Sequence, residues 1–146
     1  MQKTLEDFAT LAEEGRGLAT VAVLRSDATI HSSLVNVAVL ASPHTGAVSL
    51  GFVTYGAVKL RNLRQRPRCT VSIVSGSKWV TVEGDAELIG PDDQPAWFDQ
   101  SRLPALLREV FVAAGGSHDD WEAYDRVMAE QRRVAVFVAP QRIYGV

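Results

Sequence analysis

Cysteine is nearly absent from this sequence, since Cys69 is the only one among 146 residues. One thiol can form neither an internal disulfide nor a cysteine-built zinc site, so we expect a protein of the reducing cytoplasm. No apolar run approaches the roughly 18 residues that cross a bilayer. The N-terminal segment MQKTLEDFATLAEEGRG is amphipathic and acidic, unlike a secretory signal. We therefore expect no membrane span.

Several enzyme motifs are also missing. The chain has no GxSxG elbow, no HExxH or HxxxH pair, no Walker A loop and no GxGxxG fingerprint. The three histidines, His31, His44 and His118, fall in a predicted strand, a turn and a helix start. We therefore expect no metal site and assign no catalytic side chain.

Acidic residues are absent between Asp27 and Glu83, although the mean composition predicts about six there. The same stretch holds six basic residues, five of them within ten positions: Lys59, Arg61, Arg64, Arg66, Arg68 and Lys78. The net charge of −2 argues against nucleic-acid binding. The concentrated basic segment favours a specific anion site. The alternative is a solvated helix face whose arginines pair with distant acids or complement the helix dipole.

The length and an ordinary apolar fraction of 47% predict a single domain over residues 1–146. Hydrophobic periodicity and turn residues predict six strands and four or five helices. The strands are 17–25, 29–41, 47–53, 68–74, 78–90 and 132–140, followed by an extended tail. The helices are 4–14, 58–66, 92–114 (interrupted near Pro104) and 117–131, with Ser117 as N-cap. Short spacings with hairpin turns predict an antiparallel barrel. Three strands are apolar on both faces, which predicts covering helices or a second subunit, hence a homodimer.

Three features of these elements are candidates for binding. Lys59 begins the second helix, and Arg61 and Arg64 share one face of it, so together they could hold a phosphate or carboxylate. Trp79 lies on the polar face of its strand and could stack on a planar ligand or be covered by a helix or partner. Asn36 is a lone amide in an apolar run, either a satisfied core group or a hydrogen-bonder to a heterocycle.

The segments SSLVNVAVL, SLGFVTYGAVKLRNLRQRPRCTVSI and WVTVEG, in this order and spacing, resemble the pyridoxamine 5′-phosphate oxidase-like split β-barrel flavoproteins. The K-x-R-N-L-R-x-x-P-R pattern from Lys59 to Arg68 is similar to the actinobacterial branch that uses the deazaflavin coenzyme F420, as are HDDWEAYDRVMAEQRRV and RIYG. The resemblance covers nearly the whole chain. It implies a mainly β, FMN-binding-like fold: a six-stranded antiparallel split barrel with flanking helices, which forms a homodimer with the cofactor in a groove between subunits.

The resemblance also implies a cofactor site. The residues matching Lys59, Arg61 and Arg64 hold the anionic tail, and Leu60 belongs to the same segment. The ring system is lined by residues of three strands: Ser33, Val35, Asn36, Phe52, Val53, Trp79 and Val80. FMN-using members carry R-Q ahead of V-x-V-E-G, whereas this chain has Lys78 and Trp79, which favours F420 over FMN.

The implied function is an F420-dependent oxidoreductase in which reduced deazaflavin gives a hydride to a conjugated small-molecule acceptor. Such chemistry needs no acid or base side chain, consistent with the missing motifs. One alternative is a carrier of F420 or FMN without efficient turnover. The others are an FMN-dependent pyridoxamine phosphate oxidase-like enzyme and a haem protein with His31 as axial ligand. The family's extended basic, histidine-bearing C-terminal region is missing, which argues against pyridoxal phosphate synthesis.

Overall fold

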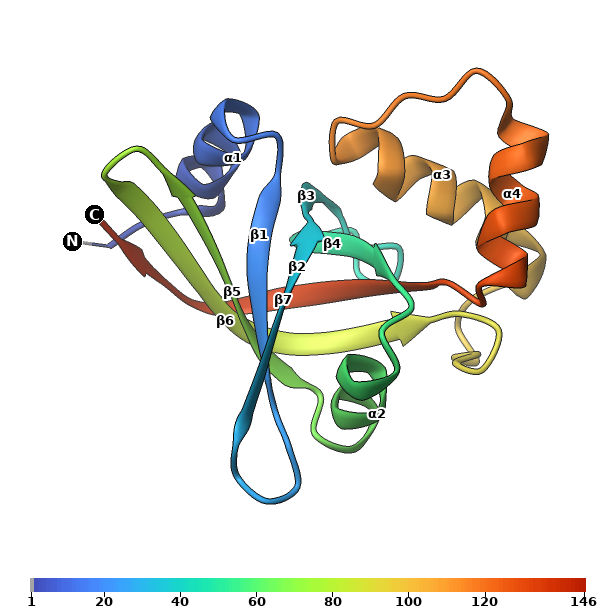
Figure 1. Cartoon of the computed structure of the whole chain (residues 1–146), viewed down its shortest axis with the longest axis horizontal. Helices are drawn as coiled ribbons and strands as arrows, with labels where there is room; N and C mark the ends of the chain where they lie inside the picture. Colours follow the sequence, from blue (N-terminus) through green and yellow to red (C-terminus); the bar gives the residue numbers. More distant parts are fainter. Residues whose placement is uncertain (1) are drawn as a thin grey trace.

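A seven-stranded antiparallel sheet is the centre of the computed structural model, which describes residues 2–146 (Figure 1). The strands are β1 (Leu18–Leu24), β2 (Ile30–Asn36), β3 (Ala38–Ala41), β4 (Val48–Thr54), β5 (Arg68–Ser75), β6 (Lys78–Ile89) and β7 (Val134–Gly145). Their order across the sheet is β2-β1-β5-β6-β7-β4-β3. The sheet is not closed, because the edge strands β2 and β3 each pair on one side only.

The predicted mainly β, antiparallel split-barrel fold with flanking helices is confirmed, although the sheet has seven strands where six were predicted. The predicted strand over 29–41 divides at Val37, whose N–H donates to the Gly17 carbonyl at 2.8 Å. β2 then pairs with β1, while β3 pairs with β4 at the opposite edge. One continuous apolar run therefore contributes strands to both edges of the same sheet.

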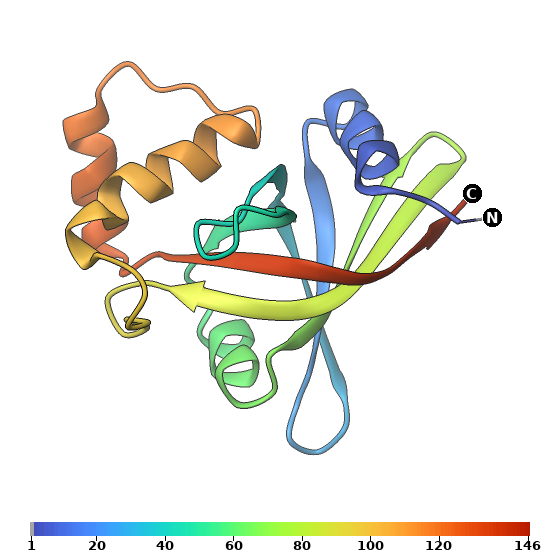
Figure 2. The ribbon, with the colours of Figure 1, turned by 180° about the vertical axis from the view of Figure 1, so that it is seen from behind.

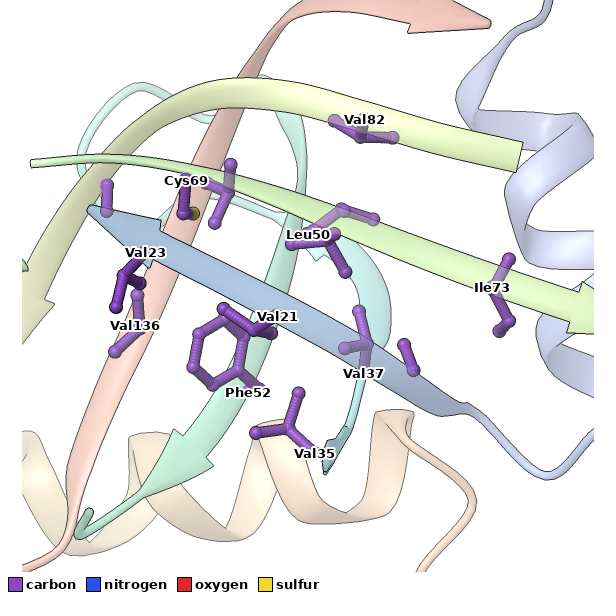
Figure 3. Close-up of a cluster of buried hydrophobic side chains, with 14 of the residues drawn as sticks. Val21, Val23, Val35, Val37, Leu50, Phe52, Cys69, Ile73, Val82 and Val136 are labelled. Atoms are coloured by element: carbon purple, nitrogen blue, oxygen red, sulfur yellow. The ribbon is translucent and has the colours of Figure 1, made fainter. Parts of the chain in front are cut away.

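Side chains join the two edges where backbone pairing does not. Val35 of β2, Phe52 of β4 and Val21 of β1 pack together in the hydrophobic core (Figure 3). All three are buried, and Val21 and Phe52 are wholly inaccessible. Each such side chain stabilises the fold by about 1.5–3 kcal/mol. The open sheet is thus curled into a split barrel around this core.

The first two helices follow their sequence signals. α1 (Leu5–Glu14) begins at the predicted cap, where Thr4 and Asp7 form a capping box, and it packs on β5 and β6. α2 (Ala57–Gln65) follows β4 and ends before Pro67, as expected. These two helices lie on opposite sides of the sheet (Figure 1).

The other two helices, α3 (Leu103–Ala113) and α4 (Trp121–Glu130), form a hairpin beside β4 and β7. The prediction of a helix from residue 92 was wrong, because α3 begins with Pro104 in its first turn after a single 3-10 turn. Proline fits that place since it has no N–H to donate. Asp120, not Ser117, caps α4 through its side chain.

β7 continues through the segment expected to be a tail, since residues 140–145 pair with β6. The pairing shifts register at a bulge between Glu83 and Gly84. Gln2 bridges to Tyr144, so the two ends of the described chain lie side by side (Figure 2). No helix among residues 2–146 has the length and apolar content to cross a membrane.

Candidate functional site

Lys59 carries a buried ammonium at the start of α2. Its side chain is 4% exposed, and Nζ donates to Thr54 Oγ1 at 2.9 Å. Nζ also lies 5.8 Å from the centroid of the Phe52 ring. No carboxylate of residues 2–146 comes within ion-pair distance of it. An ammonium has three donors, so Lys59 retains capacity for an anion.

A second cation, Arg133, lies near Lys59 and is also without a carboxylate partner in the described chain. Its guanidinium carbon lies 3.8 Å from the centroid of the Tyr55 ring, and Nε donates to Gln131 Oε1 at 2.8 Å. Burial lowers the pKa of both basic groups, and repulsion from Arg133 lowers the pKa of Lys59 further. A bound anion would relieve both effects.

The acidic pair Asp92–Asp93 neutralises two other arginines. Asp93 accepts two hydrogen bonds from Arg64, at 2.8 and 2.6 Å, and Asp92 pairs with Arg132 at 2.6 Å. These contacts raise the pKa of both guanidinium groups. Arg61 is exposed and has no ion pair among the described residues. The alternative in which an arginine of this segment pairs with a distant acid therefore applies to Arg64. Lys59 and Arg61 remain available to bind an anion.

The inward face of β2 presents polar atoms that lack partners. Ser33 Oγ and His31 Nδ1 are both buried, with no hydrogen bond to any described residue. A buried hydroxyl without a partner is uncommon and costs stability. Val35, two residues on, is buried in the core. The Ser33 hydroxyl thus fits a ligand that supplies a hydrogen-bonding group at this edge.

A pocket of about 190 Å³ lies between the barrel and the α3–α4 hairpin. Two of the predicted ring-lining residues, Asn36 and Val53, form its barrel side. Its other lining residues are Val110, Phe111, Ala114, Tyr124, Met128 and Arg133. The fold therefore brings the ends of β2 and β4 to the same hollow as Arg133.

The remaining predicted residues lie apart from this group. Trp79, 37% exposed, stands edge-on to Tyr144 with the ring centroids 6.2 Å apart. It lies beside the C-terminus, where its carbonyl accepts a hydrogen bond from the Val146 N–H at 3.0 Å, whereas α2 lies at the opposite end of β5 (Figure 1). The side chains of Leu60 and Val80 are buried in the core. Within a single chain, Lys59 lies near Phe52, and Asn36 and Val53 line the same pocket. Trp79 lies apart from both pairs.

Sequence reasoning missed Arg133, Tyr55 and the aromatic side chains of the helical hairpin. Arg133 lies outside the basic window between Lys59 and Arg68, which drew the attention to other cations. The signal that could have found it is the Arg-Arg pair directly before the buried strand VAVFV. Among residues 2–146 no group of three or more metal-ligating side chains is assembled.

No family model matches the chain. Its fold is shared by solved structures of low sequence identity. One is named F420 reductase, with 18% identity, a TM-score of 0.59, and coverage of 92% of this chain and 94% of that one. Another is a pyridoxamine 5′-phosphate oxidase-related, FMN-binding protein from Nostoc punctiforme, with 13% identity, a TM-score of 0.63, and coverage of 99% and 86%.

A haem-binding protein from Mycobacterium smegmatis has the same fold, with 22% identity, a TM-score of 0.59, and coverage of 93% of this chain and 53% of that one. These similarities establish the pyridoxamine 5′-phosphate oxidase-like fold for this chain. They also show that proteins of this fold include both enzymes and binding proteins.

Proposed function

We propose that this chain is a cytoplasmic, single-domain F420-dependent oxidoreductase that reduces a conjugated small-molecule acceptor. The observation that carries the proposal is the buried Lys59 ammonium, which has a hydroxyl but no carboxylate for a partner. An unpaired buried cation costs stability, so its presence favours a role in binding an anion. The fold shared with a protein named F420 reductase supports the same reading.

The residues present fit an anionic cofactor with a planar ring. Lys59 and Arg61 would form charge-assisted hydrogen bonds with the tail, and Arg64, held by Asp93, would add positive charge beside them. The Ser33 hydroxyl and the Asn36 amide would hydrogen-bond the ring edge, against the apolar side chain of Val53. When bound and reduced, F420 supplies a hydride which, with a solvent proton, reduces a conjugated double bond by two electrons.

We further propose that a second copy completes the site, as a homodimer. The exposed face of the sheet carries large apolar side chains on adjacent strands: Leu18, Leu24, Ile30, Leu34, Val74, Trp79 and Tyr144. Cross-strand pairing sets Leu24 opposite Ile30 and Val74 opposite Trp79, which makes the surface continuous within each pair. A contiguous apolar surface of this kind favours association. Dimerisation would bring Trp79 of one copy toward the Lys59 site of the other.

The test is equilibrium binding of F420 and of FMN, followed by tryptophan fluorescence at low and moderate salt. We expect tighter binding of F420, weakened by salt. Lys59→Ala should weaken it by about 1.5–3 kcal/mol, the scale of a hydrogen bond to a charged group. Arg126→Ala is the matched control, because Arg126 is an exposed cation on α4. Tighter binding of FMN would favour the FMN-dependent alternative. Unchanged F420 affinity in Lys59→Ala would contradict the assignment of Lys59 to the site of the cofactor tail.

A single-turnover experiment separates an enzyme from a carrier. Protein loaded with reduced F420 is mixed with conjugated acceptors, and reoxidation is followed by absorbance. We expect at least one acceptor to reoxidise the bound cofactor faster than the same cofactor free in solution. If none does, while F420 still binds tightly, the protein is a carrier.

A further inference from the structure

The pocket between the barrel and the α3–α4 hairpin differs in chemistry from the Lys59 site. Most of its lining residues are apolar or aromatic, Val53, Phe111 and Met128 among them, while Asn36 and Arg133 give it polar surface as well. Its volume is about 190 Å³, and an apolar cavity of about 150 Å³ already holds benzene. The pocket is therefore suited to one planar ring.

Two polar side chains, those of Arg133 and Asn36, line this pocket. The Arg133 guanidinium stacks on Tyr55, uses Nε on Gln131, and has no further hydrogen bond to the described residues. Asn36, an exposed residue at the end of β2, adds an amide to the lining. The lining contains no acidic side chain. A planar guanidinium without a carboxylate is suited to bidentate binding of a ligand carboxylate.

The hairpin walls are held in place by their own contacts. Arg108 of α3 forms a two-bonded ion pair with Asp125 of α4, with one bond, Nε to Oδ1, at 2.9 Å. Tyr124 Oη donates to the Leu107 carbonyl at 3.2 Å, and the rings of Tyr124 and Phe111 lie 5.0 Å apart. Asp125 is thereby engaged with Arg108 and leaves Arg133 unpaired. A pocket fixed in this way loses little entropy on binding.

We propose that this pocket is the acceptor site and that it selects planar conjugated carboxylates, with Arg133 as the anion-binding residue. The assignment as acceptor site rests on the proposed function, because the pocket shares Asn36 and Val53 with the expected ring site. The binding itself does not depend on the cofactor. Reduction of such an acceptor adds the hydride to the double-bond carbon remote from the carboxylate and a solvent proton to the adjacent carbon.

The test uses trans-cinnamate and trans-cinnamamide, a carboxylate and a neutral amide of nearly the same shape. Affinities for the cofactor-free protein are measured by calorimetry. We expect cinnamate to bind at least tenfold more tightly than cinnamamide. Arg133→Gln should remove that preference and leave the amide affinity within twofold, because a purely structural defect would weaken both ligands. Arg126→Gln is the matched control and should behave as the wild type.

Two further variants keep the test decisive. If Arg133→Gln does not fold, Arg133→Lys keeps the charge but loses the planar fork, and should lower the preference at least threefold. If Lys59→Gln abolishes the preference while Arg133→Gln retains it, the carboxylate binds at Lys59 and the proposal is wrong. Equal affinity of the wild type for both probes also overturns it. F420 binding, measured separately, reports on the proposed function, so the two can fail independently.

Discussion

The Lys59 ammonium donates a 2.9 Å hydrogen bond to the Thr54 hydroxyl inside the protein, and no carboxylate of the described chain balances its charge. Both residues lie where β4 passes into α2, so the strand–helix junction positions the cation. Nearby Arg64 shows the contrasting case, because Asp93 neutralises it. The protein therefore retains one buried charge that folding alone does not require.

Lys59→Met should stabilise the cofactor-free protein while it weakens F420 binding. The variant removes an uncompensated buried charge, so we expect its free energy of unfolding at pH 7.5 to rise by about 1 kcal/mol. Burial lowers the pKa of Lys59 below 10.5 in the folded state. Between that lowered pKa and 10.5, the unfolded chain therefore binds more protons than the folded protein, and the stability of the wild type rises with pH. The wild type should thus recover stability relative to Lys59→Met between the lowered pKa and 10.5. Urea unfolding at several pH values checks this, and equal stability at all of them would contradict it.

Leu34→Asp should separate the proposed dimer into monomers. Leu34 is 64% exposed on the edge strand β2, and a carboxylate there would have to be desolvated in an interface. Light scattering coupled to size-exclusion chromatography measures the mass. Val127→Asp, at an exposed valine of α4, is the control and should leave the dimer intact. A monomeric wild type would rule out the dimer.

Trp79→Ala should change F420 affinity or the range of acceptors with little effect on folding. The indole is partly exposed and contacts Tyr144 only edge-on, so its loss should lower the free energy of unfolding by less than about 1 kcal/mol. Cofactor titration and urea unfolding are measured together. A large destabilisation with normal F420 binding would show that Trp79 is structural.

Gly84→Ala should destabilise the fold strongly because the β6–β7 bulge leaves no room for a side chain. A Cβ at Gly84 would lie 2.1 Å from the Ala139 carbonyl oxygen, which belongs to backbone and cannot rotate away. We expect a loss of at least about 2 kcal/mol. Gly15→Ala is the control, since its nearest contact would be 3.4 Å. Similar unfolding midpoints for the two variants would disprove this account.

Cys69 should be inert in the folded protein. Burial raises the pKa of its thiol to about 12, so little thiolate is present at pH 8. Reaction with a disulfide reagent at pH 8 should be at least about 100-fold slower in native buffer than in guanidinium chloride. Fast reaction of the native protein would mean that the strand opens or that the thiol is accessible.

Local signals in the sequence were sufficient for the helices α1 and α2 and for most strands. Thr4 and Asp7 cap α1 through contacts three residues apart, and Pro67 stops α2 because it cannot continue a helix. The anion-binding role proposed for Lys59 also comes from the sequence, from its place in a basic segment at a helix start, and it stays a prediction. Each of these inferences depends on neighbours within one or two turns of chain.

Tertiary structure alone decided the rest. The sequence does not mark Val37 as the point where the chain crosses between sheet edges, because the run is apolar on both sides of it. Nor does it say which cations are free, since Asp93 reaches Arg64 across 29 residues and leaves Lys59 and Arg133 unpaired. The physical reason is that hydrogen bonds and periodicity within a segment are local, whereas burial and charge pairing depend on which distant segments the fold brings together.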